Sequence, residues 1–510
     1  MRSSLLSIVF LFIVSSGFSQ VFYVNKKASG TGNGSSWQNA FTTLHEALDN
    51  LPANSEIWVA EGDYVPYNGI SRDSSFKPKS GMKLYGGFAG TETSRSQRDF
   101  ELYKTIISGE AGPADTTGNI GVLMSIYNQP DTIVVDGFTF TGAANNIQRT
   151  STITLQHANL KMLNCDIVGN YSTAGNCGAG GIKGDSCSVS VVNTKFRNNI
   201  GKSYRSLYLY NAKLSVEGCS FFDEVSPGYA NYLIYYSSNK DIVSFSNCVF
   251  SGNLQGTLYL HSKYSRIQNC KFLNNKTDNY IFYGGGDSLV IENSRFEGNS
   301  ANQSLLYYAN LHMRNTEVLN NATVLGYCFR DSTILENCRI ENNIPTKYSS
   351  GFVYNMNCDF KNCLFKNNSS GWNSPTIYAG QNCKMVNCIF EKNNTGVGNG
   401  GVAYYNTLYA DGCVFKDHYA SYGGALYGGT ATINNSVFDR NRAKQTGGAI
   451  YCYGSINLEN TIFTNNSLDT ATSMFPKQGG VMYVGNHVNA QNCIFSNNSG
   501  EKGAVLYSSY

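Results

Sequence analysis

The Asp and Glu carboxylates are candidate catalytic groups in this sequence if several of them lie close together in the folded chain. A calcium-dependent lyase needs clustered carboxylates beside a basic residue, and a glycoside hydrolase needs two or three Asp or Glu side chains around one sugar bond. The densest acidic region instead alternates in sign along two columns, which are Glu292, Arg314, Glu336, Lys361 and Arg295, Glu317, Arg339. We interpret it as a solvent-facing ladder of salt bridges, each worth ~0 to 1 kcal/mol. The remaining acidic candidates are scattered and do not converge: Asp185, Asp287, Asp331 and Asp359.

Histidine and glycine give no sign of a metal or phosphate site. The run from Gly284 to Gly286 lacks the Lys and the Ser or Thr of a phosphate loop. No serine or thiol triad is signalled. The six histidines lie far apart and match no zinc spacing: His45, His157, His261, His312, His418 and His487. The sequence therefore assigns no catalytic residue, no metal and no cofactor.

A repeat positions most of the remaining residues. The motif Asn-Cys-x-Phe recurs in fourteen steps from Phe140 to Phe495, so the period is about 25 residues, which is typical of a solenoid. In a strand, residues two apart share a face, so the Cys and Phe positions point the same way, and we predict that they point inward. Stacking of the coils at about 4.8 Å then buries one continuous core. The predicted fold is an all-β, right-handed parallel β-helix of about 15 coils.

An asparagine follows the Phe position by three residues in most coils. An inward asparagine at a bend can donate its amide to one neighbouring coil and accept from the other, so stacked copies form a ladder that satisfies the turn backbone. We expect His418 to break this ladder once. The ladder asparagines are Asn199, Asn253, Asn275, Asn299, Asn321, Asn343, Asn368, Asn393, Asn441, Asn466 and Asn498.

Nine of the fifteen cysteines occupy the inward position of the motif, where Ser and Thr substitute freely. This interchange indicates that the position needs a small side chain, and parallel stacked Cβ vectors suit a disulfide poorly. We therefore predict buried thiols rather than disulfides, with Cys358 and Cys383 in adjacent coils as the pair best placed to be an exception. The nine are Cys165, Cys219, Cys248, Cys270, Cys338, Cys363, Cys388, Cys413 and Cys493.

A column of tyrosines precedes the Cys position by eleven to fifteen residues. The residue before each tyrosine is nearly always apolar, so the period of two places the aliphatic side chain inside and the tyrosine outside. Such a strip of phenols can lie against sugar rings or a protein partner, although the tyrosines can also serve only to cover one another. The candidate binding residues in this column are Tyr354, Tyr378, Tyr404, Tyr427 and Tyr451.

A second candidate surface is the outward position between Cys and Phe. It is polar or charged in earlier coils, such as Lys195, Lys271 and Arg295, and becomes aliphatic in later ones. A covering segment or partner explains this change, and so does ordinary aliphatic stacking. The later residues are Leu364, Ile389, Val414, Val437, Ile462 and Ile494.

The ends of the chain predict export and capping. Residues 1–19 have a charged start, an apolar stretch and small residues before Gln20, as in a signal peptide. No later segment reaches eighteen uninterrupted apolar residues, so we expect no transmembrane span in the mature chain.

Residues 20–135 are expected to form an amino-terminal cap and the first coils, with a helix over residues 39–51 that ends at Pro52. Residues 136–510 are expected to form the β-helix repeats. Because the last coil stops before its Asn-Cys-x-Phe half, we expect a missing carboxy-terminal module. A net charge of +3 does not suggest a nucleic-acid partner.

Two sets of motifs carry a resemblance to known proteins. The residues from Gly32 to Phe41, Glu56 to Tyr64 and Leu84 to Phe88 resemble the amino-terminal region of secreted bacterial β-helix proteins of the pectate-lyase-like superfamily. Phe438 to Asn441, followed by Gly447 to Ile450, is similar to the repeat of chlamydial polymorphic outer-membrane proteins. The resemblance implies the fold, whereas its chemistry stays open because the superfamily holds lyases, hydrolases, adhesins and passenger domains.

These observations favour an exported, non-catalytic protein, secreted or held at the cell surface. We expect it to act in adhesion or in binding a glycan or surface protein, with glycan as the favoured ligand class. The alternative is a polysaccharide lyase or glycoside hydrolase of the same fold. A groove lined by three or more carboxylates with a Lys or Arg would distinguish the alternative.

Overall fold

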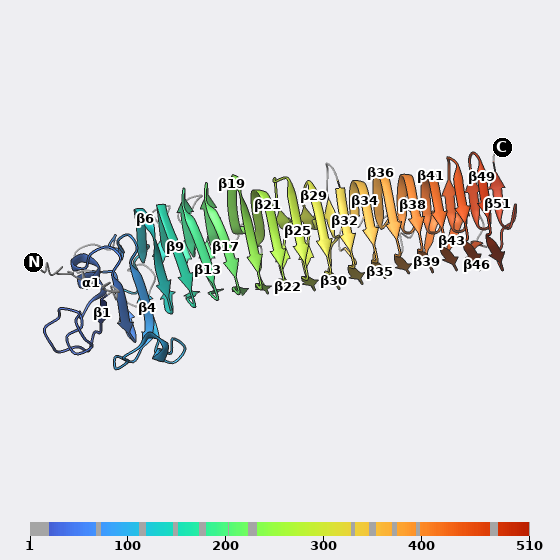
Figure 1. The fold of residues 1–510 in the computed structure, drawn as a ribbon. Helices are drawn as coiled ribbons and strands as arrows, with labels where there is room; N and C mark the ends of the chain where they lie inside the picture. Colours follow the sequence, from blue (N-terminus) through green and yellow to red (C-terminus); the bar gives the residue numbers. More distant parts are fainter. Residues whose placement is uncertain are drawn as a thin grey trace, which may run out of the picture.

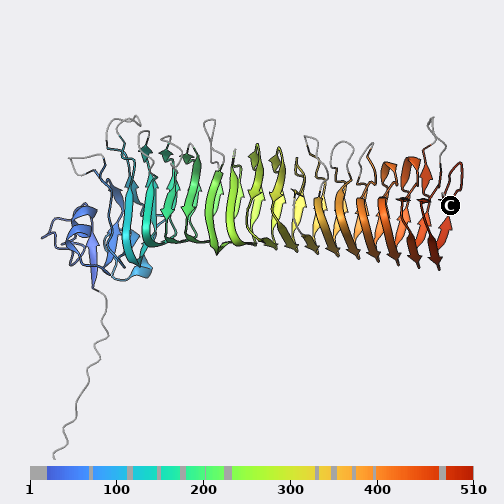
Figure 2. The same cartoon turned by 90° about the horizontal axis from the view of Figure 1, so that it is seen from above.

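The computed structural model describes most of the chain after the predicted signal peptide, which lies outside the described residues. The described ranges are 20–67, 73–111, 119–145, 151–172, 180–201, 203–222, 232–254, 256–327, 332–345, 353–369, 375–393, 398–469 and 478–508. The chain winds as a right-handed parallel β-helix of about fifteen coils, as predicted, and the coils follow one another along a single axis (Figures 1 and 2).

Each coil contributes to a long sheet and to a short sheet, and the paired strands of the described residues run parallel to each other. The strands of the long sheet are β1 (Val21–Val24), β2 (Glu56–Ala60), β4 (Lys83–Phe88), β6 (Met124–Asp136), β9 (Ile153–Leu163), β12 (Ile182–Asp185), β13 (Ser188–Val192), β16 (Tyr204–Tyr210), β17 (Lys213–Glu217), β19 (Tyr232–Ser246), β21 (Thr257–Gln268), β24 (Tyr280–Tyr283), β25 (Ser288–Glu292), β28 (Ser304–Tyr307), β29 (Asn310–Arg314), β31 (Gly326–Tyr327), β32 (Ser332–Glu336), β34 (Val353–Lys361), β36 (Ile377–Val386), β38 (Ala403–Asp411), β41 (Leu426–Asn434), β44 (Ile450–Cys452), β45 (Ile456–Glu459), β48 (Met482–Val484), β49 (Val488–Gln491) and β51 (Leu506–Ser508).

The short sheet stacks strands of three or four residues. These are β3 (Gly62–Tyr64), β5 (Thr105–Ser108), β7 (Phe138–Thr141), β10 (Asp166–Val168), β14 (Lys195–Arg197), β18 (Ser220–Phe222), β20 (Val249–Ser251), β22 (Lys271–Leu273), β26 (Arg295–Glu297), β30 (Glu317–Leu319), β33 (Arg339–Glu341), β35 (Leu364–Lys366), β37 (Ile389–Glu391), β39 (Val414–Lys416), β42 (Val437–Asp439), β46 (Ile462–Thr464) and β50 (Ile494–Ser496).

Some coils add a strand on a third side. These strands form three small groups: β8 (Ala144–Asn145), β11 (Tyr171–Ser172) and β15 (Ile200–Gly201); β23 (Lys276–Thr277) and β27 (Ser300–Ala301); and β40 (Tyr419–Tyr422), β43 (Arg442–Thr446) and β47 (Ser467–Leu468).

The corner between the two sheets explains the asparagine of the Asn-Cys-x-Phe motif. Asn193, Asn247 and Asn269 have φ of 49°, 55° and 54°, in the left-handed region that asparagine tolerates better than most residues. Where the motif has glycine instead, at Gly218 and Gly412, φ is 62° and 63°. The motif asparagine therefore makes the turn that carries the chain from the long sheet to the short one.

The Phe position forms the predicted column in the core. Phe250, Phe272 and Phe296 are register partners in β20, β22 and β26 and are almost completely buried. Their ring centroids are 4.6 and 4.7 Å apart, with planes inclined by 4° and 9°. Like residues thus lie on like residues along one axis, as the repeat predicted.

The asparagine ladder is also confirmed. Asn275 Nδ2 donates to Asn299 Oδ1 at 3.0 Å and to the Phe250 carbonyl at 2.9 Å, while the Asn275 backbone N–H donates to the same Asn299 Oδ1 at 3.0 Å. Each side chain therefore satisfies backbone groups of neighbouring coils at a buried turn. Asn170 belongs to the same ladder, because it donates to Asn199 Oδ1 at 3.0 Å.

As predicted, His418 interrupts the row of side-chain hydrogen bonds, because in the described structure its ring bonds neither to the Asn393 side-chain amide nor to Asn441 Oδ1, but the ring keeps two backbone contacts of the ladder. His418 Nε2 lies 3.0 Å from the Phe390 carbonyl, where an asparagine would place its amide donor. His418 Nδ1 lies 3.2 Å from the backbone nitrogen of Asn393, where an asparagine would place its acceptor. A neutral imidazole with its proton on Nε2 therefore supplies the two backbone contacts of the ladder, but not the bonds to the neighbouring asparagine side chains.

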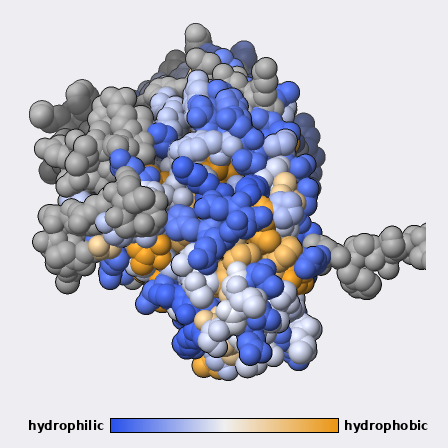
Figure 3. Space-filling view, turned by 90° about the vertical axis from the view of Figure 1, so that its left-hand side faces the viewer, coloured by the Kyte–Doolittle hydropathy of each residue, from blue (hydrophilic) through white to orange (hydrophobic). Residues whose placement is uncertain are grey.

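The cap at the amino-terminal end holds a helix shorter than predicted. The helix α1 spans Leu44–Asn50 and begins at a capping box between Thr43 and Glu46. The residues before it are extended, because Phe41 exchanges backbone hydrogen bonds with Tyr23 and Asn25 of the first coil. Leu44, Ala47 and Leu48 are buried, and the end of the molecule presents hydrophilic side chains around smaller hydrophobic patches (Figure 3). A short 3-10 helix, η1 (Arg95–Gln97), follows β4.

Candidate functional site

The tyrosines of the later coils form one continuous outward row, which we call the tyrosine strip: Tyr354, Tyr378, Tyr404, Tyr427 and Tyr451. They are register partners in β34, β36, β38, β41 and β44, and successive ring centroids are 4.6, 4.9, 5.5 and 4.8 Å apart. The residue before each ring is buried, so the aliphatic side chain lies inside and the tyrosine outside, as predicted. Each ring is half-buried between its neighbours and keeps one edge in solvent.

An earlier row extends the same column. Tyr235 and Tyr259 stack at 4.7 Å, and Tyr283 and Tyr307 at 4.8 Å. The side chain of Tyr327, which the sequence placed in this column, lies outside the described residues. Further along the chain, Tyr483 stacks on Tyr451 at 4.6 Å.

Sequence reasoning missed the tyrosines that widen these rows. Tyr204 and Tyr232 pair in register and their rings stack at 5.9 Å, beside the main column. In the later coils, Tyr422 lies edge-on to Tyr451 at 5.7 Å, and Tyr453 lies 6.2 Å from Tyr427. The strand register shifts between Tyr204 and Leu207, so no constant spacing marks these positions in the sequence.

The surroundings of the tyrosine strip are polar but nearly neutral. A row of amide and hydroxyl side chains runs beside it through Asn357, Asn382, Thr407 and Thr430, which pair in register. Asn382 Nδ2 donates to Asn357 Oδ1 at 2.9 Å, and Asn382, Thr407 and Thr430 are exposed. Burial together with neighbouring phenols raises the pKa of Tyr451 to about 12 and also raises the pKa of Tyr427, so these phenols stay neutral donors at ordinary pH.

The aliphatic candidates do not join the tyrosine strip. Leu364, Ile389, Val414 and Ile462 lie in β35, β37, β39 and β46 of the short sheet, whereas the tyrosines lie in the long sheet. The two candidate surfaces predicted from the sequence are therefore separate faces of the β-helix.

The acidic region forms the predicted salt-bridge ladder in part: among the described residues Glu292 pairs with Arg266, outside its predicted column, and Lys361 makes no ion pair. Glu317 lies between Arg295 at 2.9 Å and Arg339 at 3.5 Å, and Arg314 pairs with Glu336 at 2.9 Å. Among the scattered carboxylates, Asp359 lies 3.9 Å from Lys384, and Asp331 lies outside the described residues. In the described ranges, no three His, Cys, Asp or Glu side chains gather as a metal site would require.

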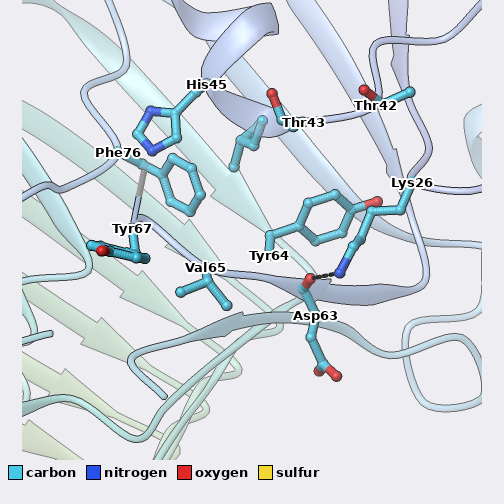
Figure 4. Close-up of a pocket in the computed structure, with 10 residues that line it drawn as sticks. Lys26, Thr42, Thr43, His45, Asp63, Tyr64, Val65, Tyr67 and Phe76 are labelled. Atoms are coloured by element: carbon cyan, nitrogen blue, oxygen red, sulfur yellow. Dashed lines mark hydrogen bonds between the residues drawn. The ribbon is translucent and has the colours of Figure 1, made fainter. Parts of the chain in front are cut away.

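A pocket near the amino-terminal end was not predicted. It has a volume of about 460 Å³ and lies between α1 and the loop that follows β3, with His45, Tyr64, Tyr67 and Phe76 among its lining residues (Figure 4). Lys26 Nζ donates to the Asp63 carbonyl at 2.6 Å, while the Asp63 carboxylate points away from the rings. The described lining of the pocket therefore offers apolar surface, a few polar groups and one ammonium group, and it holds a single carboxylate rather than the pair needed for acid and base catalysis.

The nine cysteines of the motif are thiols, eight of them buried. Cys165 Sγ donates to the Leu163 carbonyl at 3.1 Å, and burial raises the pKa of the Cys165 thiol to about 12. We expect Cys165 to resist alkylation at pH 8 in the native protein and to react once guanidinium unfolds the chain, because the thiolate is the reactive form. Peptide mapping by mass spectrometry without reductant measures this.

Cys493 provides the internal control, since it is partly exposed and should label before the other eight. Alkylation of Cys165 as fast as that of Cys493 in the native protein would contradict the buried position, and resistance after unfolding would indicate a disulfide.

Comparison with known proteins agrees with the architecture. A family model described as a right handed beta helix region matches residues 258–415, which span the salt-bridge ladder and the first three residues of the tyrosine strip. No curated protein matches the chain. In the described part of the chain, no helix has the length and apolar character needed to span a membrane.

Proposed function

We propose that this β-helix is an exported, non-catalytic binding protein that holds a glycan along its tyrosine strip. The observation that carries the proposal is the unbroken row of stacked phenols from Tyr354 to Tyr451, each with an exposed edge. Because the ring faces are covered by neighbouring rings, the row offers a surface of apolar ring edges to sugar rings, and the hydroxyl groups donate hydrogen bonds. Export is inferred from the signal-peptide pattern of residues 1–19.

The row beside the strip favours a glycan over an apolar partner. Asn382, Thr407 and Thr430 present donors and acceptors at the spacing of the coils, which suits a ligand with regularly repeated hydroxyl groups. Charged side chains are few there, with Asp359 and Lys384 paired to each other. We therefore expect a neutral polysaccharide rather than a uronic-acid polymer.

The arrangement of carboxylates supports a binding role rather than catalysis. A retaining or inverting hydrolase holds two carboxyl groups at opposite sides of one sugar bond. In the described residues the acidic side chains of the ladder are each engaged by an arginine or lysine instead.

Replacing Tyr354, Tyr378 and Tyr427 together by alanine is expected to weaken polysaccharide binding about 100-fold, since each ring contributes roughly 1 kcal/mol. Affinity electrophoresis against a panel of neutral and acidic polysaccharides measures the change. The matched control replaces the same three residues by phenylalanine, which keeps the stacked faces and should retain most of the affinity.

Two results would count against the proposal. If the alanine variant stays folded by circular dichroism and binds as the parent does, the tyrosine strip is not the binding surface. If incubation with uronic-acid polymers yields unsaturated product, followed by its absorbance, the protein is a lyase.

A further inference from the structure

The outer face of the short sheet changes character along the molecule. The outward side chain between the Cys and Phe positions is charged in β22, β26, β30 and β33, where it is Lys271, Arg295, Glu317 and Arg339. In the next six coils it is aliphatic, and we call this row the apolar stripe: Leu364, Ile389, Val414, Val437, Ile462 and Ile494. Ile389 is 45% and Ile494 56% exposed. Five coil spacings of about 4.8 Å make the stripe about 24 Å long.

Charged side chains lie beside the first four coils of the apolar stripe. The row beside it reads Lys366, Glu391, Lys416, Asp439, Thr464 and Ser496, and the next row reads Asn367, Lys392, Asp417, Arg440, Asn465 and Asn497. Arg440 pairs with Asp417 and with Asp439, each at 2.7 Å. The carboxy-terminal third of both rows is neutral.

We propose that the apolar stripe binds a second copy of this chain, face to face and with the two β-helices antiparallel. A two-fold axis that lies in the interface, perpendicular to the long axis, sets each row against its own reversed copy. Matching the stripe end to end places Leu364 against Ile494, Ile389 against Ile462, and Val414 against Val437 of the second copy. All six aliphatic side chains then lose contact with water.

The same register brings opposite charges together. Lys416 faces Asp439 of the second copy, and Asp417 faces its Arg440, and symmetry repeats both pairs. Moving outward, Glu391 meets Thr464 and Lys392 meets Asn465, so no like charges are opposed. If the two β-helices were instead parallel, with the two-fold axis along the stripe, the rows on its two sides would exchange places. The charged row on one side would then face the uncharged corner row on the other, which contains Asn387, Gly412 and Asn435, and its charges would gain no new partners. The charge pattern therefore selects a second copy in the antiparallel orientation.

The size of the apolar stripe indicates a reversible dimer. A face about 24 Å long and one strand wide lies at the low end of specific interfaces, below roughly 1,200 Å² in total. Dimerisation is therefore expected to depend on protein concentration. The tyrosine strip lies in the other sheet and stays accessible in such a dimer.

Sedimentation velocity over a concentration series tests the proposal. Val414→Asp is expected to weaken self-association by on the order of 100-fold, because it places a carboxylate at the centre of the apolar contact. Ser220→Asp is the matched control, since Ser220 occupies the equivalent outward position in β18, away from the apolar stripe, and it should leave association unchanged. Circular dichroism confirms that both variants fold.

A charge exchange tests the orientation. Lys416→Asp and Asp439→Lys should each weaken association about tenfold, and the double variant should restore it, because the exchanged carboxylate and ammonium groups again face each other across the two-fold axis. A parent protein that stays monomeric throughout the series, or association that survives Val414→Asp, would overturn the proposal. Failure of the double variant to restore association would overturn the antiparallel register.

Discussion

Phe272→Ala is expected to destabilise its part of the β-helix by about 3 to 5 kcal/mol, the usual cost of truncating a buried phenylalanine. Phe272 is fully buried, stacks between Phe250 and Phe296, and meets the edge of Phe282 at 4.8 Å. Alanine would leave a cavity in the column, and the neighbouring coils cannot move together to fill it because their strands are held apart by backbone hydrogen bonds.

The loss should stay local, because each coil of a solenoid contacts only its neighbours. Hydrogen exchange followed by mass spectrometry should therefore show faster exchange in β20, β22 and β26 and little change in β42 and β46. Leu273→Ala is the matched control, since Leu273 is the next residue and its side chain points outward. Equal effects of the two substitutions, or faster exchange spread evenly over the chain, would contradict a single stacked column.

The inward columns could be predicted because one physical constraint fixes both their spacing and their residue types. Stacked coils place equivalent residues in register, so Phe272 must lie between Phe250 and Phe296 in the same column. The Phe position also keeps a constant spacing from the corner asparagine. The outward direction of the tyrosine strip followed from the same alternation. Tyr204 and Tyr453 could not be found this way, because they lie in stretches where register shifts or turn length varies.

Other features could not be predicted, because they depend on contacts between residues that are distant in the sequence. Apolar spacing suggested a helix from residue 39, but Phe41 pairs with the first strand, a contact that no local pattern reveals. The pocket around His45 and Tyr67 is built from irregular loops, so its residues do not lie at a recognisable spacing. The role of His418 appears only when its two ring nitrogens are compared with an asparagine amide.

His418 is also expected to lower the stability of the β-helix at acidic pH. Burial lowers the pKa of His418 to about 4 and outweighs the backbone hydrogen bonds to Asn393 and Phe390 and the nearby charges of Asp417 and Glu391, all of which raise it. In the unfolded chain the pKa is about 6.5. Because the folded state resists protonation, stability is complete above pH 6.5 and falls as the pH drops from 6.5 toward 4, by about 3 kcal/mol in all.

Replacing His418 by asparagine should remove this acid-dependent loss without breaking the ladder. The new amide can donate to the Phe390 carbonyl and accept from Asn393, as Asn275 does with its neighbours. Hydrogen exchange in β37 and β39 at pH 7 and pH 4.5, corrected for intrinsic rates, measures the difference. Carboxylates titrate alike in both proteins, so the difference isolates residue 418, and exposed His487→Asn is the matched control. An acid response identical in the parent and in the His418→Asn variant would mean that burial does not keep the imidazole neutral.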